Sequence, residues 1–324
     1  MIKNVVHNKG GLHNRITQSI RLLPFILAET ETYLKSRGIL LDRYQVLQIA
    51  MAMGGIPHYL KNIRRGESAA QCIDRTCFTN DGVLRDEFTN LYRSLIDRAD
   101  HRVSFVRALS KKGKGLTRNQ TIATCKLSSG GTTMTILNEL EQSGFITSYT
   151  PFDKAAKDAI FKLRDEYSLF YLKYIEKFRS TAANTWIRLS TTPGWRSWSG
   201  IAFKTICLKR IAQIKMDMGI AAVQTMESVW RYLPGKEEPG AQIDLLVDRN
   251  DYTITIFEIK FSDAAYSVTK AYAEDLKRKK DVFRKEAKTR KTLFITMITT
   301  FGIAATIHST AIVDTQLTMD ALFL

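Results

Sequence analysis

Three charged side chains lie inside two short apolar segments in the C-terminal third of the chain. Asp244 lies within residues 241–248 (AQIDLLVD), and Glu258 and Lys260 lie within residues 252–261 (YTITIFEIKF). A charged side chain inside an apolar strand costs free energy unless another group pairs with it. The two-residue repeat of a strand puts Glu258 and Lys260 on one face of a sheet. The pattern therefore predicts a cluster of functional charges on that face.

The turn between the two segments decides whether Asp244 joins this cluster. A three-residue loop over 249–251 sets Asp248 opposite Tyr252. Asp244 then lies diagonally across from Glu258 on the same face, at a separation that polar side chains can bridge through a cation. A two-residue turn would instead put Asp244 and Glu258 on opposite faces. We expect the three-residue loop.

Two carboxylates and one ammonium group on a strand face indicate a divalent-metal site. Hard oxygen ligands favour Mg²⁺ or Mn²⁺, so Asp244 and Glu258 are the predicted ligands. Such a metal polarises a scissile phosphate and activates a water molecule, while Lys260 orients that water or neutralises developing charge. These three residues are thus the predicted catalytic set. The alternative interpretation is a salt bridge that joins Lys260 to Glu258 or to Asp244.

The charge balance points to a polyanionic partner. The chain has 48 Lys and Arg residues against 32 Asp and Glu, a formal net charge of +16. Such a field attracts polyanions, of which nucleic acid is the commonest. A basic surface without a specific partner is the alternative.

Composition excludes several other classes of protein. The hydrophobic content of 44% and charged content of 25% are ordinary for a globular chain, and 324 residues suffice for about two or three domains. There is no apolar run of about 18 residues, which predicts no membrane span, and the N-terminus does not read as a signal peptide. The four cysteines show no CxxC spacing. We therefore expect a cytoplasmic protein without a zinc knuckle or a disulfide framework.

The elements that position the charged cluster belong to the last of three parts of the chain. Residues 1–100 are predicted to be mainly helical. Residues 101–178 contain short helices followed by a two-stranded hairpin, the order of a winged helix-turn-helix. Residues 185–324 show an α/β order. The expected helices cover 27–39, 43–55, 86–97, 103–113, 116–127, 128–144, 168–178, 198–219 and 270–287, and the expected strands cover 145–152, 159–167, 241–248, 252–261 and 291–302.

Several segments in one order resemble the C-terminal part of a group of prokaryotic AAA+-like ATPases. They are IRLLPFILAETETYLKSRGI (20–39), MGGIPHYL (53–60), ALSKKGKGLTR (108–118), ILNELEQSGFI (136–146), FYLKYI (170–175) and GAQIDLL (240–246). In addition, Asp244 followed by Glu258-x-Lys260 between two helices resembles the PD-(D/E)XK nuclease superfamily. The resemblance implies a multidomain α and α/β chain. It consists of a helical lid-like region with a remnant strand (1–100), a winged helix-turn-helix (101–178) and a PD-(D/E)XK restriction-endonuclease-like domain (185–324).

The sequence departs from the ATPase pattern at its N-terminal end. No G-x-x-x-x-G-K-[ST] motif occurs, so we expect no ATP site in this chain. Residues 12–26 resemble the last strand of an ATPase domain whose earlier strands are absent. Such a strand needs a cover, which predicts either a separate ATPase chain as partner or self-association through residues 12–26.

A second departure concerns the predicted metal site. Relatives often carry a glutamate on the first helix of the nuclease-like domain, in a Gly-x-x-Phe-Glu context. The matching segment here begins at Gly200 and reads Phe203-Lys204, so a lysine replaces the acid. A lysine does not ligate a metal ion, and it repels one that is close.

The helix expected over 270–287 is rich in cations. The residues predicted there to contact DNA phosphates are Lys277, Arg278, Lys280 and Arg284. The alternative is a solvated helix whose charges pair internally, as Glu274–Arg278 and Asp281–Lys285.

The third helix of the winged module begins with a hydroxyl-rich segment. Thr132 and Thr133 are predicted to meet phosphates or base edges there. The alternative is a winged helix that serves as a spacer between protein domains.

These observations predict a DNA-binding protein with a nuclease-like domain, in its active form a Mg²⁺-dependent DNA endonuclease. Two alternatives remain open. One is a catalytically degenerate DNA-binding or regulatory fragment of the ATPase family, which Lys204 favours. The other is a subunit that works with a separate ATPase chain.

Overall fold

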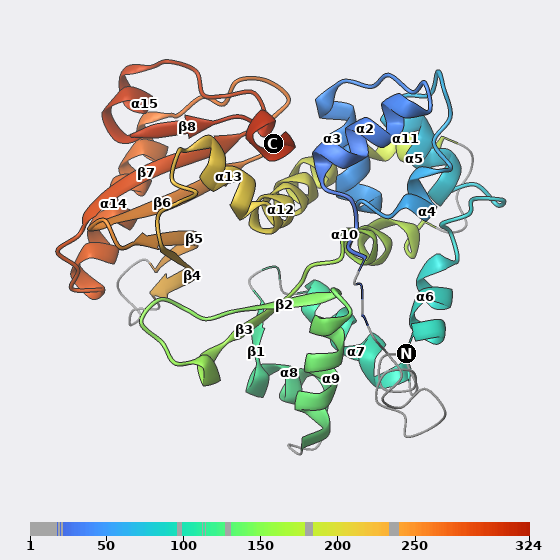
Figure 1. Ribbon diagram of the computed structural model, residues 1–324, viewed down its shortest axis with the longest axis horizontal. Coiled ribbons are helices and arrows are strands. Elements are labelled where there is room, and N and C mark those ends of the chain that lie inside the picture. The colour runs from blue at the N-terminus through green and yellow to red at the C-terminus, as the bar shows by residue number, and fades with distance from the viewer. Residues whose placement is uncertain are drawn as a thin grey trace.

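The computed structural model describes residues 18, 20, 22–95, 99–111, 113, 115–126, 131–178, 184–232 and 240–324. This part of the chain folds into a helical N-terminal region, a three-stranded sheet with its own helices, and a five-stranded mixed sheet covered by helices (Figure 1). The multidomain α and α/β expectation is therefore confirmed at the level of a mixed α/β architecture. None of the described helices is both long enough and apolar enough to cross a bilayer.

The N-terminal region is helical, as its composition predicts. Its helices are α2 (Leu27–Ser36), α3 (Arg43–Met53), α4 (Pro57–Leu60), α5 (Ala69–Cys77) and α6 (Glu87–Leu95). Asp42 caps α3 by accepting a hydrogen bond from the Gln45 amide, and Pro57 opens α4 at the position where a missing N–H costs nothing. The remnant strand expected over 12–26 is not found in the part of this segment that is described, because residues 18, 20 and 22–26 lie in neither a helix nor a strand.

The second region has the predicted three helices and two hairpin strands, together with a short strand, β1 (Leu116–Thr117), and a short helix, η1 (Ala156–Asp158), that were not expected. The predicted elements are α7 (Ala99–Lys111), α8 (Arg118–Cys125), α9 (Gly131–Gln142), β2 (Ile146–Tyr149) and β3 (Ile160–Leu163). Thr117 caps α8 through the Gln120 amide. The strands form an antiparallel sheet in the order β1-β3-β2.

An aromatic core joins the second region to the first. The helix predicted over 168–178 is observed as α10 (Glu166–Phe170) continued by a π-helical turn, η2 (Tyr171–Ile175). Phe170 packs edge-on against Trp186 of α11 (Thr185–Leu189), and Trp186 stacks on Phe78 beside α5. The Trp186 amide also donates a hydrogen bond to buried Asp74. These contacts bury α5, α10 and α11, three elements from distant parts of the chain, against one another.

The prediction of one long helix over 198–219 is wrong. The structure has α12 (Pro193–Lys209) and α13 (Ile211–Asp217), separated at Arg210. Thr192 and Pro193 start α12 earlier than expected, since threonine caps the helix and proline suits its first turn. At the break, the Arg210 guanidinium donates a hydrogen bond to the Phe25 carbonyl, a contact across the core.

The third region is a five-stranded sheet in the order β4-β5-β6-β7-β8. Its strands are β4 (Thr225–Tyr232), β5 (Ala241–Arg249), β6 (Thr253–Lys260), β7 (Thr292–Thr299) and β8 (Thr315–Leu317). The pairs β4–β5 and β5–β6 are antiparallel, and β6–β7 and β7–β8 are parallel. The sheet is accompanied by α14 (Lys270–Glu286), α15 (Ile307–Ile312) and η3 (Met319–Phe323).

The two faces of this sheet belong to different apolar cores. On one face, Leu245 and Phe257 pack into a core that includes Phe203 of α12. On the other face, Ile256 packs into a core with Leu276 and other residues of α14. The helices α12 and α14 therefore cover opposite faces of the sheet.

The three-stranded sheet is attached to the edge of the five-stranded sheet. The connection between β2 and β3 reaches β4, where the Phe152 amide donates a hydrogen bond of 2.8 Å to the Val229 carbonyl. The Phe152 ring packs edge-on against Phe283 of α14, with ring centroids 5.3 Å apart. This contact brings β3 close to the residues around Asp244.

Candidate functional site

The register between β5 and β6 differs from the expected one. Asp248 pairs with Ile254, not with Tyr252, so the connecting loop has the expected three residues but covers 250–252, one residue later than expected. Tyr252 lies in this loop with φ = 62°, a left-handed conformation that a non-glycine residue seldom adopts. The paired ladder ends at Leu245 and Phe257. Because the register is shifted by two residues, the expected alternation of faces along β6 is unchanged.

A β-bulge in β5 changes the face on which Asp244 lies. Ser228 pairs with Leu246 but Trp230 pairs with Ile243, so one residue of β4 opposes two residues of β5, Asp244 and Leu245. The alternation of side-chain faces along β5 is interrupted at this point, so Asp244 and Leu245 both face α12.

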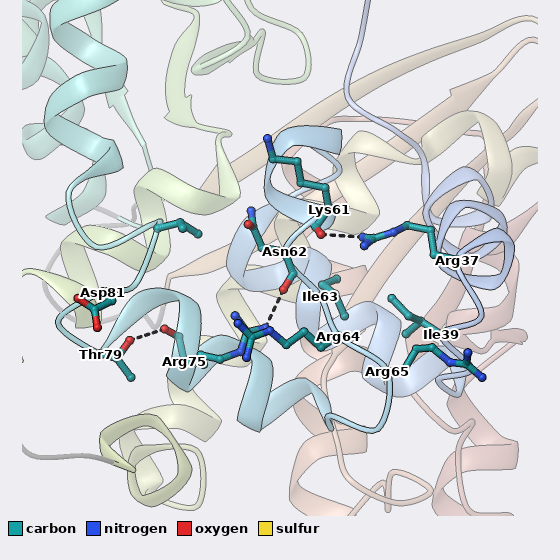
Figure 2. Close-up of a pocket in the computed structure, with 11 residues that line it drawn as sticks. Arg37, Ile39, Lys61, Asn62, Ile63, Arg64, Arg65, Arg75, Thr79 and Asp81 are labelled. Carbon is teal, nitrogen blue, oxygen red and sulfur yellow. Dashed lines mark hydrogen bonds between the residues drawn. The ribbon is translucent and has the colours of Figure 1, made fainter.

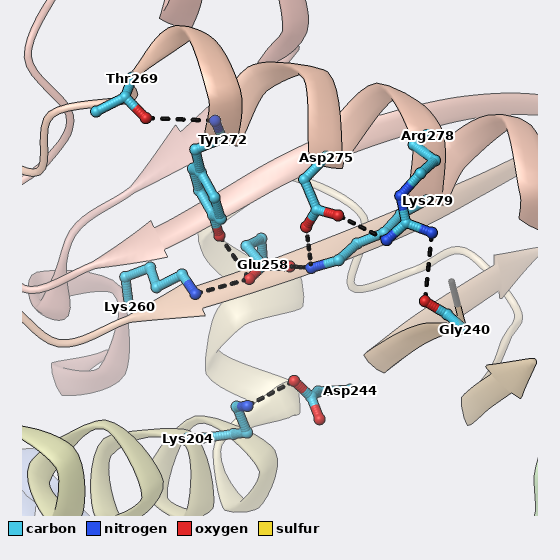
Figure 3. Close-up of polar contacts among 10 residues, drawn as sticks. All are labelled: Lys204, Gly240, Asp244, Glu258, Lys260, Thr269, Tyr272, Asp275, Arg278 and Lys279. Carbon is cyan, nitrogen blue, oxygen red and sulfur yellow. Dashed lines mark hydrogen bonds and ion pairs between the residues drawn. The ribbon is translucent and has the colours of Figure 1, made fainter. Parts of the chain in front are cut away.

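Asp244 is paired with a lysine of α12. Lys204 Nζ lies 2.5 Å from Asp244 Oδ2 (Figure 3). The side-chain amide of Gln242 donates a hydrogen bond of 2.7 Å to Oδ1. Burial on its own would raise the pKa of Asp244. The charge and hydrogen bond of Lys204, with the charge of Lys162, instead hold that pKa below its ordinary value. Asp244 is therefore a stable carboxylate with its own counter-cation.

Lys162 brings the three-stranded sheet into this cluster. It lies on β3, and burial lowers its pKa, an effect that the Asp244 charge opposes and the charges of Lys204 and Arg231 increase. The Lys162 ammonium also lies over the Tyr149 ring, 5.4 Å from its centroid. The surroundings of Asp244 thus hold more positive than negative charge.

Glu258 is held on the opposite face by residues of α14. Tyr272 donates a hydrogen bond of 2.6 Å to Glu258 Oε1, and Lys279 Nζ lies 3.3 Å from Oε2 (Figure 3). Lys260 Nζ lies 3.0 Å from Glu258 Oε1. Burial and the charge of Glu258 raise the pKa of Tyr272. The carboxylates of Glu258 and Asp275 raise the pKa of Lys279 against the effect of its burial.

The structure confirms one part of the predicted site and corrects another. Glu258 and Lys260 share a face, as the alternation predicts, and they form the salt bridge that was the alternative interpretation. The prediction that Asp244 and Glu258 share a face is wrong, because the bulge turns Asp244 toward α12 while Glu258 faces α14. Within the described residues, no three His, Cys, Asp or Glu side chains gather to hold a metal ion. In this arrangement the predicted ligands do not fit a divalent cation.

The residues predicted to contact DNA have different surroundings. Lys277 and Arg284 are exposed on α14. Arg278 is paired with Asp275 at 2.6 Å, and Lys280 lies 3.8 Å from Asp314, so both already face a carboxylate.

The structure bears on only one of the two threonines that were predicted to contact DNA at the third helix. Thr133 is only 1% exposed, so its hydroxyl is withdrawn from the surface, and that prediction is wrong for this residue. The side chain of Thr132 lies outside the described residues.

Three residues that interact with the two carboxylates of this site were not identified from the sequence. Tyr272 and Lys279 lie seven residues apart and hence on one face of α14, a spacing that could have identified them as partners of a charge beneath the helix. Lys162 carries no local signal, because it reaches Asp244 from a different sheet.

The site is a set of carboxylates on two faces of one sheet, each bound to lysines of the same chain. Comparisons of this chain with family models, curated proteins and solved structures found no match.

Proposed function

We propose that this chain is a DNA-binding protein whose nuclease-like α/β domain binds the DNA backbone without cleaving it. The observation that carries the proposal is the pairing of both predicted metal ligands. Lys204 is bonded to Asp244, and Lys260 and Lys279 are bonded to Glu258. A carboxylate that already has an ammonium partner attracts a metal ion less, and it repels a nearby phosphate less.

The order of elements supports the two fold assignments within this proposal. We assign α7 to β3 to a winged helix-turn-helix, supported by helices α7, α8 and α9 followed by the β2–β3 hairpin. We assign α12 to β8 to a PD-(D/E)XK-like domain. That assignment is supported by a helix, three antiparallel strands, a helix and parallel strands in sequence order.

The exposed cations support contact with phosphates. Lys277 and Arg284 are seven residues apart on one side of α14, and Lys154 and Lys157 are exposed on the loop that docks against β4. Long basic side chains on a surface neutralise phosphates without reading base edges. The proposal therefore predicts affinity that depends on salt more than on sequence.

The experiment compares two double variants of the full chain on a DNA duplex. Lys277→Ala/Arg284→Ala is expected to weaken binding and to reduce the salt slope of log K by about two, since each lost phosphate contact removes about 0.9. The matched control is Lys173→Ala/Arg196→Ala, which removes the same two residue types from exposed positions on η2 and α12. Equal DNA affinity of the two variants would refute the proposal that this surface of α14 contacts DNA.

The same samples test the absence of cleavage. We expect Mg²⁺ or Mn²⁺ to leave a labelled duplex intact, and calorimetry to give no Mn²⁺ binding that Asp244→Ala removes. Metal-dependent cleavage by the wild-type chain would contradict the proposal.

A metal-dependent endonuclease is the second candidate function. It is favoured by the presence of Asp244, Glu258 and Lys260 in the order and spacing of the superfamily motif. This candidate requires that Lys204 leave Asp244 and that β5 rearrange at its bulge. It predicts cleavage that Asp244→Ala/Glu258→Ala abolishes while the thermal unfolding remains cooperative.

A partner chain at the N-terminal segment is the third part of the proposal. Leu22 and Leu23 are 90% and 68% exposed, which suits an apolar surface that a separate ATPase chain covers. Phe25 does not belong to that surface, because it packs against Tyr33. Leu22→Glu is expected to abolish association with a co-expressed ATPase chain, and retained association would refute this partner surface.

A further inference from the structure

A basic pocket of about 790 Å³ lies in the N-terminal helical region, a size typical of ligand-binding pockets. The charged residues that line it are Arg37, Lys61, Arg64, Arg65, Arg75 and Asp81, so the described lining has five cations and one carboxylate (Figure 2). The pocket shares no residue with the site around Asp244 and Glu258. Its excess of positive charge needs an explanation of its own.

Two of these cations hold the loop 61–67 in place. Arg75 of α5 forms a two-point ion pair with Glu67, with distances of 2.6 and 2.7 Å, and donates a hydrogen bond to the Asn62 carbonyl. Arg37 donates a hydrogen bond of 2.8 Å to the Lys61 carbonyl. Both arginines therefore fix the backbone of the loop, and the charge of Glu67 is balanced by Arg75.

The other three cations have no such role. The side chains of Lys61, Arg64 and Arg65 make no hydrogen bond or ion pair with the described residues, and all three are exposed. The Arg65 guanidinium lies against Gly38, where an added Cβ would be 3.3 Å from it. The hydrogen bond and charge of Arg75 lower the pKa of Glu67 more than the charge of Arg64 does. The fixed loop thus presents three positive charges that have no hydrogen-bonded or ion-paired partner among the described residues.

Unpaired like charges around one pocket repel each other, and an anion that enters it removes that repulsion. Guanidinium groups are well suited to phosphate oxygens, with which they form two parallel hydrogen bonds. We propose that this pocket binds the phosphate backbone of a nucleic acid strand. The inference goes beyond the DNA contact proposed for α14, since it places a second contact in a different region of the chain.

The arrangement of the cations favours a run of phosphates over one isolated phosphate. In Figure 2, Arg64 extends toward Arg75, Arg65 extends in the other direction beside Ile39, and Lys61 projects from another side of the pocket. The cations are therefore distributed around the pocket and do not converge on one point. A backbone that passes along the pocket meets several of them in turn, whereas a single phosphate meets few.

The test uses Arg64→Ala/Arg65→Ala in the full chain, with Arg93→Ala/Arg196→Ala as the control. The control removes two exposed arginines that do not line the pocket and make no ion pair with described residues. Affinity for a DNA duplex is measured by fluorescence anisotropy between about 50 and 200 mM salt, and pyrophosphate binding is measured by calorimetry. We expect the pocket variant to bind DNA about tenfold more weakly at low salt. We also expect its slope of log K against log[salt] to be less steep by about two.

Each outcome decides the proposal. A loss of DNA affinity in the pocket variant and not in the control supports it. A loss of pyrophosphate binding without a loss of DNA affinity would overturn the nucleic acid as occupant, and no change in either would overturn the phosphate site. Lys277→Ala/Arg284→Ala separates the two surfaces, because a failure of the α14 proposal leaves the effect of Arg64→Ala/Arg65→Ala intact. A wild-type chain that binds no DNA would refute both.

Discussion

The sheet site and the helical pocket are both built from lysines and arginines, but their cations meet different neighbours. In the sheet, Lys204 and Lys279 are each bonded to a carboxylate on a strand. In the pocket, Lys61, Arg64 and Arg65 have no such partner among the described residues. The first group of cations stabilises the fold, and the second is free to bind an external anion.

This difference shows why the positive charge of a segment does not locate a binding surface. The α14 helix has many cations, yet Arg278 and Lys279 are used within the chain. The loop 61–67 has fewer cations, but the two arginines that fix it leave its other cations exposed. The number of unpaired charges on a fixed backbone is the better indicator of an anion site.

The largest expected effect tests the paired side of this comparison. Lys204→Met leaves the Asp244 carboxylate, 20% exposed, without its main partner. We expect the free energy of unfolding to fall by about 2 kcal/mol, because an unpaired and largely buried acceptor costs about 1–3 kcal/mol. Urea unfolding measures it, with Lys61→Met as a matched control that changes stability by less than about 0.5 kcal/mol. Equal losses of unfolding free energy in the two variants would contradict the view that Lys204 is paired and Lys61 is not.

The pH dependence of that loss sharpens the comparison. Because Lys204 lowers the pKa of Asp244 below 3.8, the pair stabilises the folded chain above that pH and loses its effect as the pH falls below it. The stability difference between wild type and Lys204→Met should therefore shrink in acid, whereas the effect of Lys61→Met should stay constant. A difference that grows as the pH falls would refute the ion pair.

A smaller effect is expected at the other carboxylate. Tyr272→Phe removes a hydrogen bond of 2.6 Å to Glu258, which keeps Lys260 and Lys279 as partners. We expect a loss of about 1 kcal/mol in the free energy of unfolding. Tyr252→Phe is the control, since Tyr252 is exposed. A Tyr272→Phe variant as stable as that control would show that the lysines alone hold Glu258.

The smallest effect on stability is expected in the pocket. Arg64→Ala/Arg65→Ala removes cations that form no hydrogen bond or ion pair with the described residues, so the free energy of unfolding of this variant should match wild type within about 0.5 kcal/mol at low salt. Destabilisation by more than about 1 kcal/mol would mean that these arginines have structural partners and would remove the contrast between the two regions.

Most local elements could be predicted from the sequence. Strands over 241–248 and 252–261 were predicted within a residue or two of β5 and β6, because their apolar composition and flanking turns are local features. The break at Arg210 was not predicted, since no glycine or proline marks it and the contact to Phe25 is distant in sequence.

The candidate site was predicted less well than the strands that carry it. The bulge at Asp244 depends on β4, a strand that the pattern did not indicate, and one extra residue is enough to change the face of a side chain. Lys204 was identified by its place in the resemblance, and the structure puts it against Asp244. Tyr272 and Lys279 became partners of Glu258 only once α14 was placed across the sheet.

The sequence by itself determined most of the secondary structure, the excess of positive charge and the face shared by Glu258 and Lys260, because these follow from composition and short-range periodicity. The tertiary structure decided which charges are paired. An ion pair needs two atoms within a few ångströms, and in the pair of Lys204 and Asp244 those atoms come from residues 40 positions apart. The distance in space between the two atoms is set by helix packing, a strand bulge and the docking of a second sheet, and none of these is contained in a local sequence pattern.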